Sequence, residues 1–510
     1  MGATMKSKKL LIPITFLFFT GISANLFASS FADTFGFSAE GMARGNAMTA
    51  TVNDWSSVYY NVAGLGKTQN ITEAVQEGEM TLKLRKEGEE TDEKKIYPNQ
   101  IALGFMYVIP QMNLNIPQRY WYDPPNPSFP LKTNAKDMEP YGFTTVGAVV
   151  DINNLFKMPD FISSARLGLG MGMNADLSLV KVNDVDPRTH DFLRHGKEIQ
   201  RAIIIIGGAL GYLNDAIGLG LGVNLAFSGK ANAYMDTSLT GNPQIPITES
   251  MMELKVAPGI VAGAYLSPGK IFSAIDGLEL GASYRQETVL KIDPFNAGAG
   301  ILGGVIEMTL MLAIWDYYSP HVITGGVAYT RWGLTISGDI NYEMWSRSTL
   351  SKVWKSSCIG IPKYNDIMVY KAGLKYDIPL NVGTLSLMTG YSFIPSIIGK
   401  DAGTKPGIRF DSVSTRLAFG MYNFLDNDKH NASLGFKYTL PKMGRFGGQI
   451  VFTVSYQLQY LVPKSVSKTG FSYDIGAGTQ DDPLQTYLLN PSYSYGGMNH
   501  SVFVEVGMRI

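Results

Sequence analysis

Long segments with a strict two-residue alternation of apolar and polar side chains constrain this chain more than any other feature. In residues 334–344, LTISGDINYEM, one face is almost entirely apolar and the other is polar. Residues 449–460, 431–440 and 502–510 alternate in the same way. Successive side chains of a β-strand point to opposite faces, so a two-residue period indicates strands. The chain is therefore predicted to be an all-β protein.

The alternating segments are about 10 to 16 residues long, whereas strands of soluble sandwiches typically have 5 or 6. Aromatic residues stand near their ends, among them Tyr329, Trp332, Trp345 and Tyr460. Long strands with one apolar face, one polar face and aromatic girdles are typical of transmembrane barrels. Because lipid offers backbone groups no hydrogen bonds, such a sheet must close on itself. We therefore predict a transmembrane antiparallel β-barrel of about 14 strands.

The expected strands are spread from residue 71 to the C-terminus. They cover residues 71–86, 100–109, 165–182, 199–213, 217–234, 251–266, 278–292, 303–331 (one bent strand or two), 333–347, 367–378, 383–395, 430–440, 447–462 and 498–510. Residues 143–152 and 412–422 are strand-like as well and belong either to loops or to further strands. Long connections are expected at 110–140, 183–197 and 399–428.

Residues 1–32 are predicted to be a secretory signal peptide. Three lysines precede the apolar run 10–27, and small residues follow it. A transmembrane anchor is the alternative, but Pro13 and Asn25 interrupt the run. No later stretch offers the roughly 20 consecutive apolar residues that a spanning helix needs.

Composition excludes several classes of function. Loss of the signal with its three lysines leaves 40 basic and 43 acidic residues, a net charge of about −3. No basic excess exists to bind nucleic acid. The single cysteine, Cys358, rules out an intrachain disulfide framework.

Residues 33–65 lack the alternation and are rich in Gly, Ala, Ser and Thr. We interpret this stretch as a small plug, or hatch, inside the barrel that follows. The predicted organisation is a signal at 1–32, a hatch at 33–70 and a barrel with long loops at 71–510.

Three motifs in the hatch carry a resemblance to a known family. They are Gly41-Met42-Ala43-Arg44-Gly45-Asn46-Ala47, then Asn53-Asp54, then Tyr60-Asn61-Val62-Ala63-Gly64-Leu65. This series resembles the N-terminal hatch of the long-chain fatty-acid outer-membrane transporter family (FadL/TodX, OMPP1), which reads G-x-x-R-x-x-A, then D-D or N-D, then N-P-A-G-L. The resemblance continues through 319–346 and 390–435, in the same order, and it too implies 14 strands.

The resemblance implies a protein of the bacterial outer membrane that takes up long-chain fatty acids or other hydrophobic compounds. Such a ligand binds in the lumen against the hatch and leaves sideways through the barrel wall. The implied partners are this ligand, outer-membrane lipid and lipopolysaccharide, and the implied state is a monomer without cofactor or enzymatic activity. The alternatives are a general diffusion porin and a structural or adhesive surface protein or membrane hydrolase. A porin has no need of a hatch, and no nucleophile–base arrangement is evident.

A pocket for a long apolar chain needs apolar and aromatic walls with a few polar groups. The candidate ligand-binding residues are Phe35, Phe37, Met42, Met48, Trp55, Tyr59, Tyr60 and, for a carboxylate head group, Lys230. The competing interpretation of the hatch residues is ordinary packing of the plug. For Lys230 it is a solvated lysine at the end of a strand.

The candidate gate is Asn61, Val62, Ala63 and Gly64. Asn and Gly tolerate the positive φ angles of a tight turn. Val62 stands where the family has Pro, which fixes φ. The turn is therefore expected to be looser, unless Val62 packs against the wall. The side chain of Asn61 is expected to bond backbone groups and hold the turn.

Two further patterns look like binding motifs but are interpreted as ordinary structural features. His190, Asp191 and His195 form the one histidine cluster, but its spacing fits no zinc motif, and a solvated loop is expected rather than a metal site. Glycines recur with a period of two at 168–172 and 218–222. On one face of a strand they are expected to leave lumen space for the plug, since phosphate binding needs a strand–turn–helix.

Overall fold

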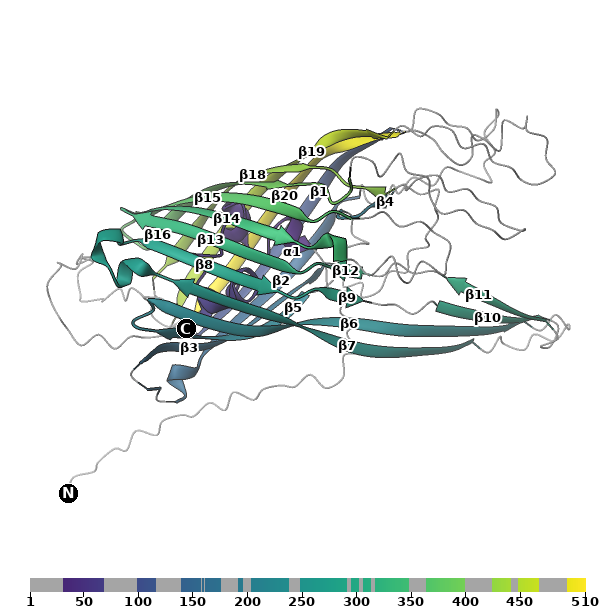
Figure 1. Cartoon of the computed structure of the whole chain (residues 1–510), viewed down its shortest axis with the longest axis horizontal. Coiled ribbons are helices and arrows are strands. Elements are labelled where there is room, and N and C mark those ends of the chain that lie inside the picture. Colours follow the sequence, from purple (N-terminus) through teal and green to yellow (C-terminus); the bar gives the residue numbers. More distant parts are fainter. Residues whose placement is uncertain are drawn as a thin grey trace, which may run out of the picture.

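The structure is a computed structural model that describes residues 31–67, 99–115, 139–156, 158–159, 161–175, 191–195, 203–237, 248–290, 295–301, 306–312, 317–347, 364–399, 424–441, 448–466 and 493–510. Fourteen antiparallel strands close into one barrel (Figure 1). They are β1 (Gln100–Asn115), β2 (Tyr141–Asp151), β3 (Ile162–Asn174), β5 (Ile203–Tyr212), β6 (Ile217–Thr237), β7 (Thr248–Leu266), β8 (Leu278–Arg285), β13 (Val322–Arg331), β14 (Leu334–Glu343), β15 (Ile367–Pro379), β16 (Thr384–Ile394), β18 (Lys429–Leu440), β19 (Gln449–Val466) and β20 (Tyr493–Arg509).

Closure occurs where β6 pairs with β7 and where the first described barrel strand, β1, pairs with the last, β20. Beyond the barrel, β6 also pairs in parallel with β10 (Phe295–Ile301), which is followed by β11 (Ile306–Leu312). Two small sheets pair β9 (Thr288–Leu290) with β12 (Tyr317–Ser319) and β4 (Asp191–Phe192) with β17 (Phe424–Leu425). Short 3₁₀ turns are η3 (Ile152–Asn154), η4 (Pro268–Lys270), η5 (Ser273–Ile275) and η6 (Trp345–Arg347).

The predicted strand number is confirmed, but two of the predicted segments differ. Residues 143–152, left open as loop or strand, form most of β2. Residues 303–331 contribute only β13 to the barrel, because their first part forms β11. The expected strand at 71–86, the strand-like segment 412–422 and Cys358 lie outside the described residues.

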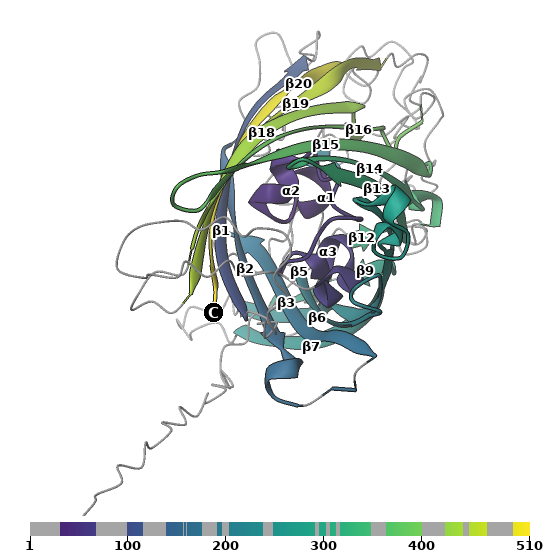
Figure 2. The same cartoon turned by 90° about the vertical axis from the view of Figure 1, so that its left-hand side faces the viewer.

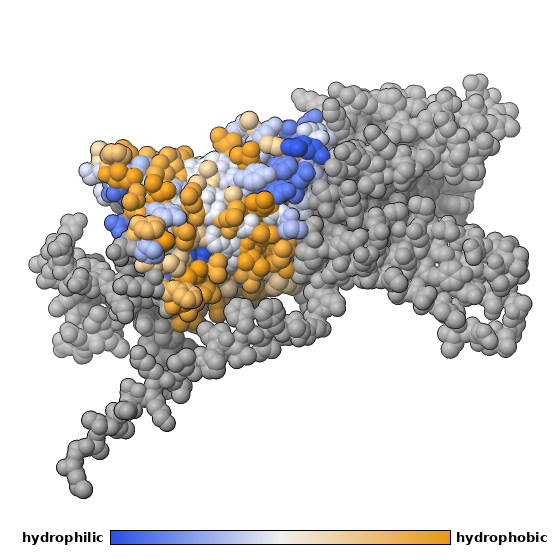
Figure 3. Space-filling model, turned by 60° about the horizontal axis from the view of Figure 1, so that its bottom comes forward, coloured by the Kyte–Doolittle hydropathy of each residue, from blue (hydrophilic) through white to orange (hydrophobic). Residues whose placement is uncertain are grey.

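Apolar faces of the strands point outward, and the inward face is polar on β14, β18 and β19 but mostly apolar on β1 and β5. In β14, Leu334, Ile336 and Ile340 are exposed, whereas Thr335, Ser337 and Asp339 are buried. Hydrophobic residues gather over much of the outer barrel surface seen in Figure 3. Apolar side chains outside and a packed interior that includes polar side chains are the reverse of a soluble protein. This arrangement suits a lipid environment, as the alternation predicted.

Three of the four aromatic residues named for the girdle lie on the outer surface. Tyr329, Trp332 and Tyr460 are exposed. Trp345 was wrongly placed in the girdle, since it is buried at the mouth of the barrel. Its ring nitrogen donates a hydrogen bond of 2.8 Å to the carboxylate of Glu343.

The two ends of the barrel differ in the length of their connections. At one end β13 turns into β14 through Trp332 and Gly333, both with positive φ. At the other end lie the long connections, including those between β1 and β2 and between β16 and β18. Because short turns face the periplasm in outer-membrane barrels, we assign the long-connection end to the outside.

Residues 31–67 lie inside the barrel, where Figure 2 shows their helices surrounded by strands. The hatch comprises α1 (Phe31–Thr34), α2 (Ala39–Ala43), α3 (Ser57–Tyr60) and the 3₁₀ turn η1 (Val62–Gly66). Ser38 caps α2 by accepting a hydrogen bond from the backbone N–H of Gly41. In the described part of the chain, every helix is too short to cross a membrane.

Candidate functional site

Glycines of β3 make room for the hatch, as the period-two pattern at 168–172 predicted. A Cβ added to Gly168 would lie 2.8 Å from Val58, and one added to Gly170 would lie 2.6 Å from the same side chain. A Cβ on Gly172 would lie 2.5 Å from Phe31. Contacts this short require atoms to shift, so larger residues on this face of β3 would displace the hatch. Of the pattern at 218–222, only Gly220 faces hatch atoms directly, since Gly218 and Gly222 lie against other wall residues.

The turn η1 lies against a second group of glycines on β5, β6 and β7. A Cβ on Gly207 would approach Val62 to 2.6 Å, and one on Gly220 would approach the backbone nitrogen of Ala63 to 2.6 Å. Gly263 leaves space for the side chain of Asn61. The candidate gate is therefore in direct contact with the wall on three adjacent strands.

The conformation of the gate differs from the expected tight turn. Asn61 is extended, with φ −163°, and caps η1 by accepting a hydrogen bond from the N–H of Ala63. Its amide donates to the carbonyls of Thr49 (2.8 Å) and Ala264 (3.0 Å), so the predicted backbone bonding is confirmed. The expected positive φ was wrong for Asn61 and Gly64. In the hatch, Gly36, Gly45 and Asn46 have positive φ instead. Val62, at the position where the family has proline, is fully buried and packs on Gly207 of the wall.

Acidic side chains of the wall hold the hatch through its backbone. Asp339 of β14 accepts hydrogen bonds from the N–H groups of Met48 and Thr49, both at 2.9 Å. Glu505 of β20 accepts from the N–H of Ala39 (3.0 Å) and from the indole of Trp55 (3.2 Å). These two carboxylates anchor the hatch to β14 and β20, which are five positions apart in the sheet order.

Ion pairs supplement these anchors. Glu40 of α2 pairs with Lys437 of β18 at 2.6 Å and with Arg44 at 3.5 Å. Burial alone would raise the pKa of Glu40, but Lys437 and other cations hold it far below its usual range. Asp33 accepts hydrogen bonds from Tyr59 of the hatch and from Arg285 of β8. The hatch is thus tied to the wall by charge as well as by shape.

The structure brings the seven candidate hatch residues into one aromatic cluster. Phe37 packs on Trp55 and Tyr59, with ring centroids 5.2 and 5.0 Å apart. All but half-buried Tyr59 are buried: Phe35, Phe37, Met42, Met48, Trp55 and Tyr60. Lys230 is separate, since it lies in β6 opposite Glu253, and its side chain is outside the described part. Ligand binding by any of these eight residues stays a prediction.

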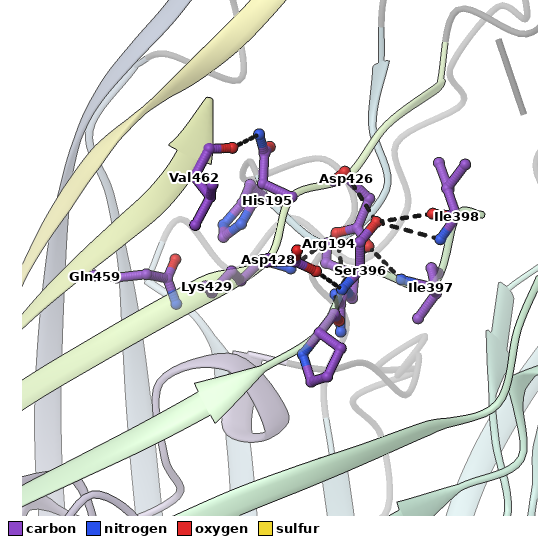
Figure 4. A network of polar contacts seen from close by, with 12 residues as sticks. Arg194, His195, Ser396, Ile397, Ile398, Asp426, Asp428, Lys429, Gln459 and Val462 are labelled. Carbon is purple, nitrogen blue, oxygen red and sulfur yellow. Dashed lines mark hydrogen bonds and ion pairs between the residues drawn. The ribbon is translucent and has the colours of Figure 1, made fainter. Parts of the chain in front are cut away.

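Sequence reasoning missed a buried charge cluster at the long-connection end, seen in Figure 4. Asp426 accepts hydrogen bonds from Arg194 (2.8 and 3.0 Å), from Lys429 (2.8 Å) and from the N–H of Ile397 (2.8 Å). We call Arg194, Asp426 and Lys429 the mouth cluster. It joins the connection before β5 to the connection between β16 and β18, which are far apart in sequence. The sequence feature that could have predicted this cluster is the run Asp426-Asn427-Asp428-Lys429, which we used only as part of the family resemblance.

His195 is not in a solvated loop, as we had expected, but is buried beside the mouth cluster. Its Nδ1 lies 3.3 Å from the amide nitrogen of Asn499, and its ring meets Phe35 of the hatch edge-on at 6.4 Å. Burial, followed by the charge of Lys429, lowers the pKa of His195 well below its usual value, so the ring is neutral at pH 7. His190 lies outside the described residues. Within those residues no group of three metal-ligating side chains occurs.

A small pocket lies between the hatch and the mouth cluster. It is lined by Asp33, Thr34, Arg194, Glu343, Trp345, Ile394 and Lys429. Both acidic and basic groups therefore face the space above the aromatic cluster.

A closed barrel with an apolar exterior and a lumen filled by a hatch defines the class of protein: a plugged transmembrane β-barrel of the bacterial outer membrane. Comparison with a solved structure agrees with this fold. A FadL homologue of Pseudomonas aeruginosa superposes with a TM-score of 0.50 at 14% identity, covering 95% of this chain and 99% of its own. The fold predicted from the hatch motifs is thereby confirmed.

A second similar structure is the toluene transporter TodX of Pseudomonas putida. Its TM-score is 0.45 at 14% identity, and the match covers 93% of this chain and 99% of TodX. No protein-family profile matches the chain, and no curated protein sequence does. At these identities the likeness concerns the fold.

Folded protein is expected to migrate differently from boiled protein in a denaturing gel, because a closed ladder of 14 strands resists detergent at room temperature. The measurement is paired electrophoresis of unheated and heated samples from purified outer membranes. A protein that shows one mobility and a helical circular-dichroism spectrum would contradict the barrel.

Proposed function

We propose that this protein takes hydrophobic molecules across the outer membrane, binding them in the lumen against the hatch and releasing them sideways through the barrel wall. The observation that carries the proposal is the hatch, whose aromatic cluster occupies the lumen of the closed barrel. A general porin needs an open aqueous channel, and a lumen filled in this way does not favour one. The fold of the FadL homologue supports the same assignment.

The structure suggests how such a ligand is held. Apolar and aromatic hatch residues supply the surface that a hydrocarbon chain requires, and a few polar groups orient its head. Because the candidate residues are packed together, a ligand must displace side chains to enter. We assign no catalytic step and no cofactor to the protein.

The test is direct binding to the purified barrel in lipid nanodiscs. Radiolabelled fatty acids, alkanes, aromatic hydrocarbons and, as hydrophilic controls, sugars are compared on protein-containing and empty discs. Retention of the hydrophobic compounds alone is expected. Retention of none, together with free passage of sugars through liposomes, would favour the porin.

A Lys230→Ala change tests whether this lysine meets a carboxylate head. We expect dodecanoate to bind about tenfold more weakly, because one charge-assisted hydrogen bond is lost. Binding of dodecane should not change. The same binding assay measures both ligands on both proteins. Lys270, an exposed lysine at the short-turn end, serves as the matched control when changed to Ala. An identical affinity for dodecanoate before and after the change would remove Lys230 from the site.

A further inference from the structure

The inner wall formed by β18, β19 and β20 carries a group of neutral amides and hydroxyls. The register places Asn431 opposite Gln459 and Gln459 opposite Asn499, and one step along, Gln457 opposite Ser501. We call the group the amide patch. Its members are Asn431, Ser455, Gln457, Gln459, Asn499 and Ser501, and each is at most 1% exposed.

The amide patch has far more hydrogen-bonding capacity than it uses. Its side-chain bonds are Asn499 to Gln459 (2.9 Å), Asn499 with His195 (3.3 Å) and Asn431 to Ser392 (3.0 Å). Within the described part of the chain, both amide atoms of Gln457 and at least one polar atom of every other member have no partner. Buried polar groups are normally satisfied, and a cluster left open is costly.

The open atoms include both donors and acceptors. Gln457 and Gln459 offer amide nitrogens, whereas Asn431 and Asn499 offer carbonyl oxygens. A group that satisfies both must itself donate and accept, as hydroxyls and amides do. No member of the patch is charged. Arg194, next to His195 in the chain, and Lys429, two residues before Asn431, are already bound to Asp426. The patch is therefore unsuited to an ionised carboxylate.

The patch adjoins the hatch as well. His195, whose Nε2 also has no partner among the described residues, contacts Asn499 on one side and the ring of Phe35 on the other. Figure 4 shows His195 and Gln459 in the same part of the lumen, next to the mouth cluster. A ligand that displaces side chains between the two would meet the amides with a polar end and the aromatic cluster with an apolar end.

We propose that the amide patch binds the uncharged, hydrogen-bonding end of an amphiphile, a hydroxyl or amide group, while its hydrocarbon part lies on the hatch. This inference rests on the proposed transport function and names the substrate class. It favours fatty alcohols and amides over ionised fatty acids. Lys230, if it meets a carboxylate, serves a different ligand group.

The test compares 1-dodecanol, dodecane and dodecanoate, all radiolabelled, on nanodiscs that contain the full-length protein. Wild-type protein is expected to bind dodecanol about tenfold more tightly than dodecane, after correction for empty discs. Gln457→Leu keeps the side-chain volume but removes both open atoms. It should weaken dodecanol binding about tenfold and change dodecane binding less than about twofold.

Two further variants complete the experiment. Asn341→Leu, which removes a buried amide of β14 outside the patch, is the matched control and should leave dodecanol binding unchanged. The double variant Ser455→Ala/Ser501→Ala removes two open hydroxyls with little steric change and should repeat the Gln457→Leu result. All variants are first checked for heat-modifiable mobility.

The outcomes separate this inference from the proposed function. Dodecanol binding that persists in both patch variants means that the patch holds only water, and it overturns the inference. Wild-type binding of dodecane and dodecanoate without preference for dodecanol also overturns it, but leaves the transport function standing. Retention of none of the three ligands contradicts both.

Discussion

Deletion of residues 33–60 is expected to convert a closed protein into a conducting pore. The barrel strands form their own continuous ladder, so the deleted chain should still fold. The hatch fills the lumen and is anchored to it by Asp339 and Glu505. Because porins with 16 to 18 strands carry an aqueous channel, a 14-stranded barrel without its plug should raise single-channel conductance at least about tenfold. Planar-bilayer recordings of full-length and deleted protein measure the effect.

The control is the unheated gel mobility of both proteins, which shows that each barrel is folded before reconstitution. A full-length protein that already conducts like an open pore would contradict the closed state. A deleted barrel that stays shut would mean that the mouth cluster, with the connections it joins, closes the lumen without the hatch. Adding Asp426→Asn to the deletion distinguishes this case, since conductance would then appear.

Asp426→Asn is expected to open the long-connection end locally. The change leaves Arg194 and Lys429 buried without a carboxylate, and breaking a buried ion pair costs about 3 kcal/mol or more. Amide hydrogens of 191–195 and 424–428 should therefore exchange about a hundredfold faster, because each 1.36 kcal/mol is a factor of ten. Hydrogen–deuterium exchange with mass spectrometry measures these segments against the central strands, whose exchange should not change.

Two comparisons sharpen this result. Asp366→Asn alters an exposed carboxylate at the same end and should have no effect on 191–195. The triple variant Arg194→Met/Asp426→Leu/Lys429→Met removes every charge of the cluster and should restore slow exchange, since apolar replacements of buried ion networks are often neutral. Fast exchange in the triple variant, or unchanged slow exchange in Asp426→Asn, would show that the ion pairs of the mouth cluster do not hold this end of the barrel closed.

The pH dependence of the mouth follows from the same contacts. Burial would raise the pKa of Asp426, but Arg194 and Lys429 hold it well below its usual range. A carboxyl with a lowered folded pKa stabilises the folded state above its unfolded pKa of about 4 and loses this contribution as pH falls further. Slow exchange at 424–428 is thus expected to persist down to about pH 4.

Which face of each strand meets lipid was determined by the sequence alone. Alternation is a local property, because neighbouring side chains on one strand necessarily point to opposite sides. Leu334 and Thr335 therefore revealed the outside and the inside of β14 without knowledge of its partners. The contact between the glycines of β3 and the hatch could be predicted for the same reason. Glycines on one face of a strand leave space, and the large side chains of the hatch fill it.

Only the tertiary structure decided which polar residues meet. Arg194 and Asp426 are 232 residues apart, and their pairing depends on where the barrel closes and how its connections fold back. Packing across the lumen likewise determines that His195 and Trp345 are buried. It also leaves both polar atoms of the Gln457 side-chain amide without a partner among the described residues. A two-residue period determines on which face of a strand a side chain lies. What that side chain touches depends on the strand register and on barrel closure, which are set by contacts between distant parts of the chain.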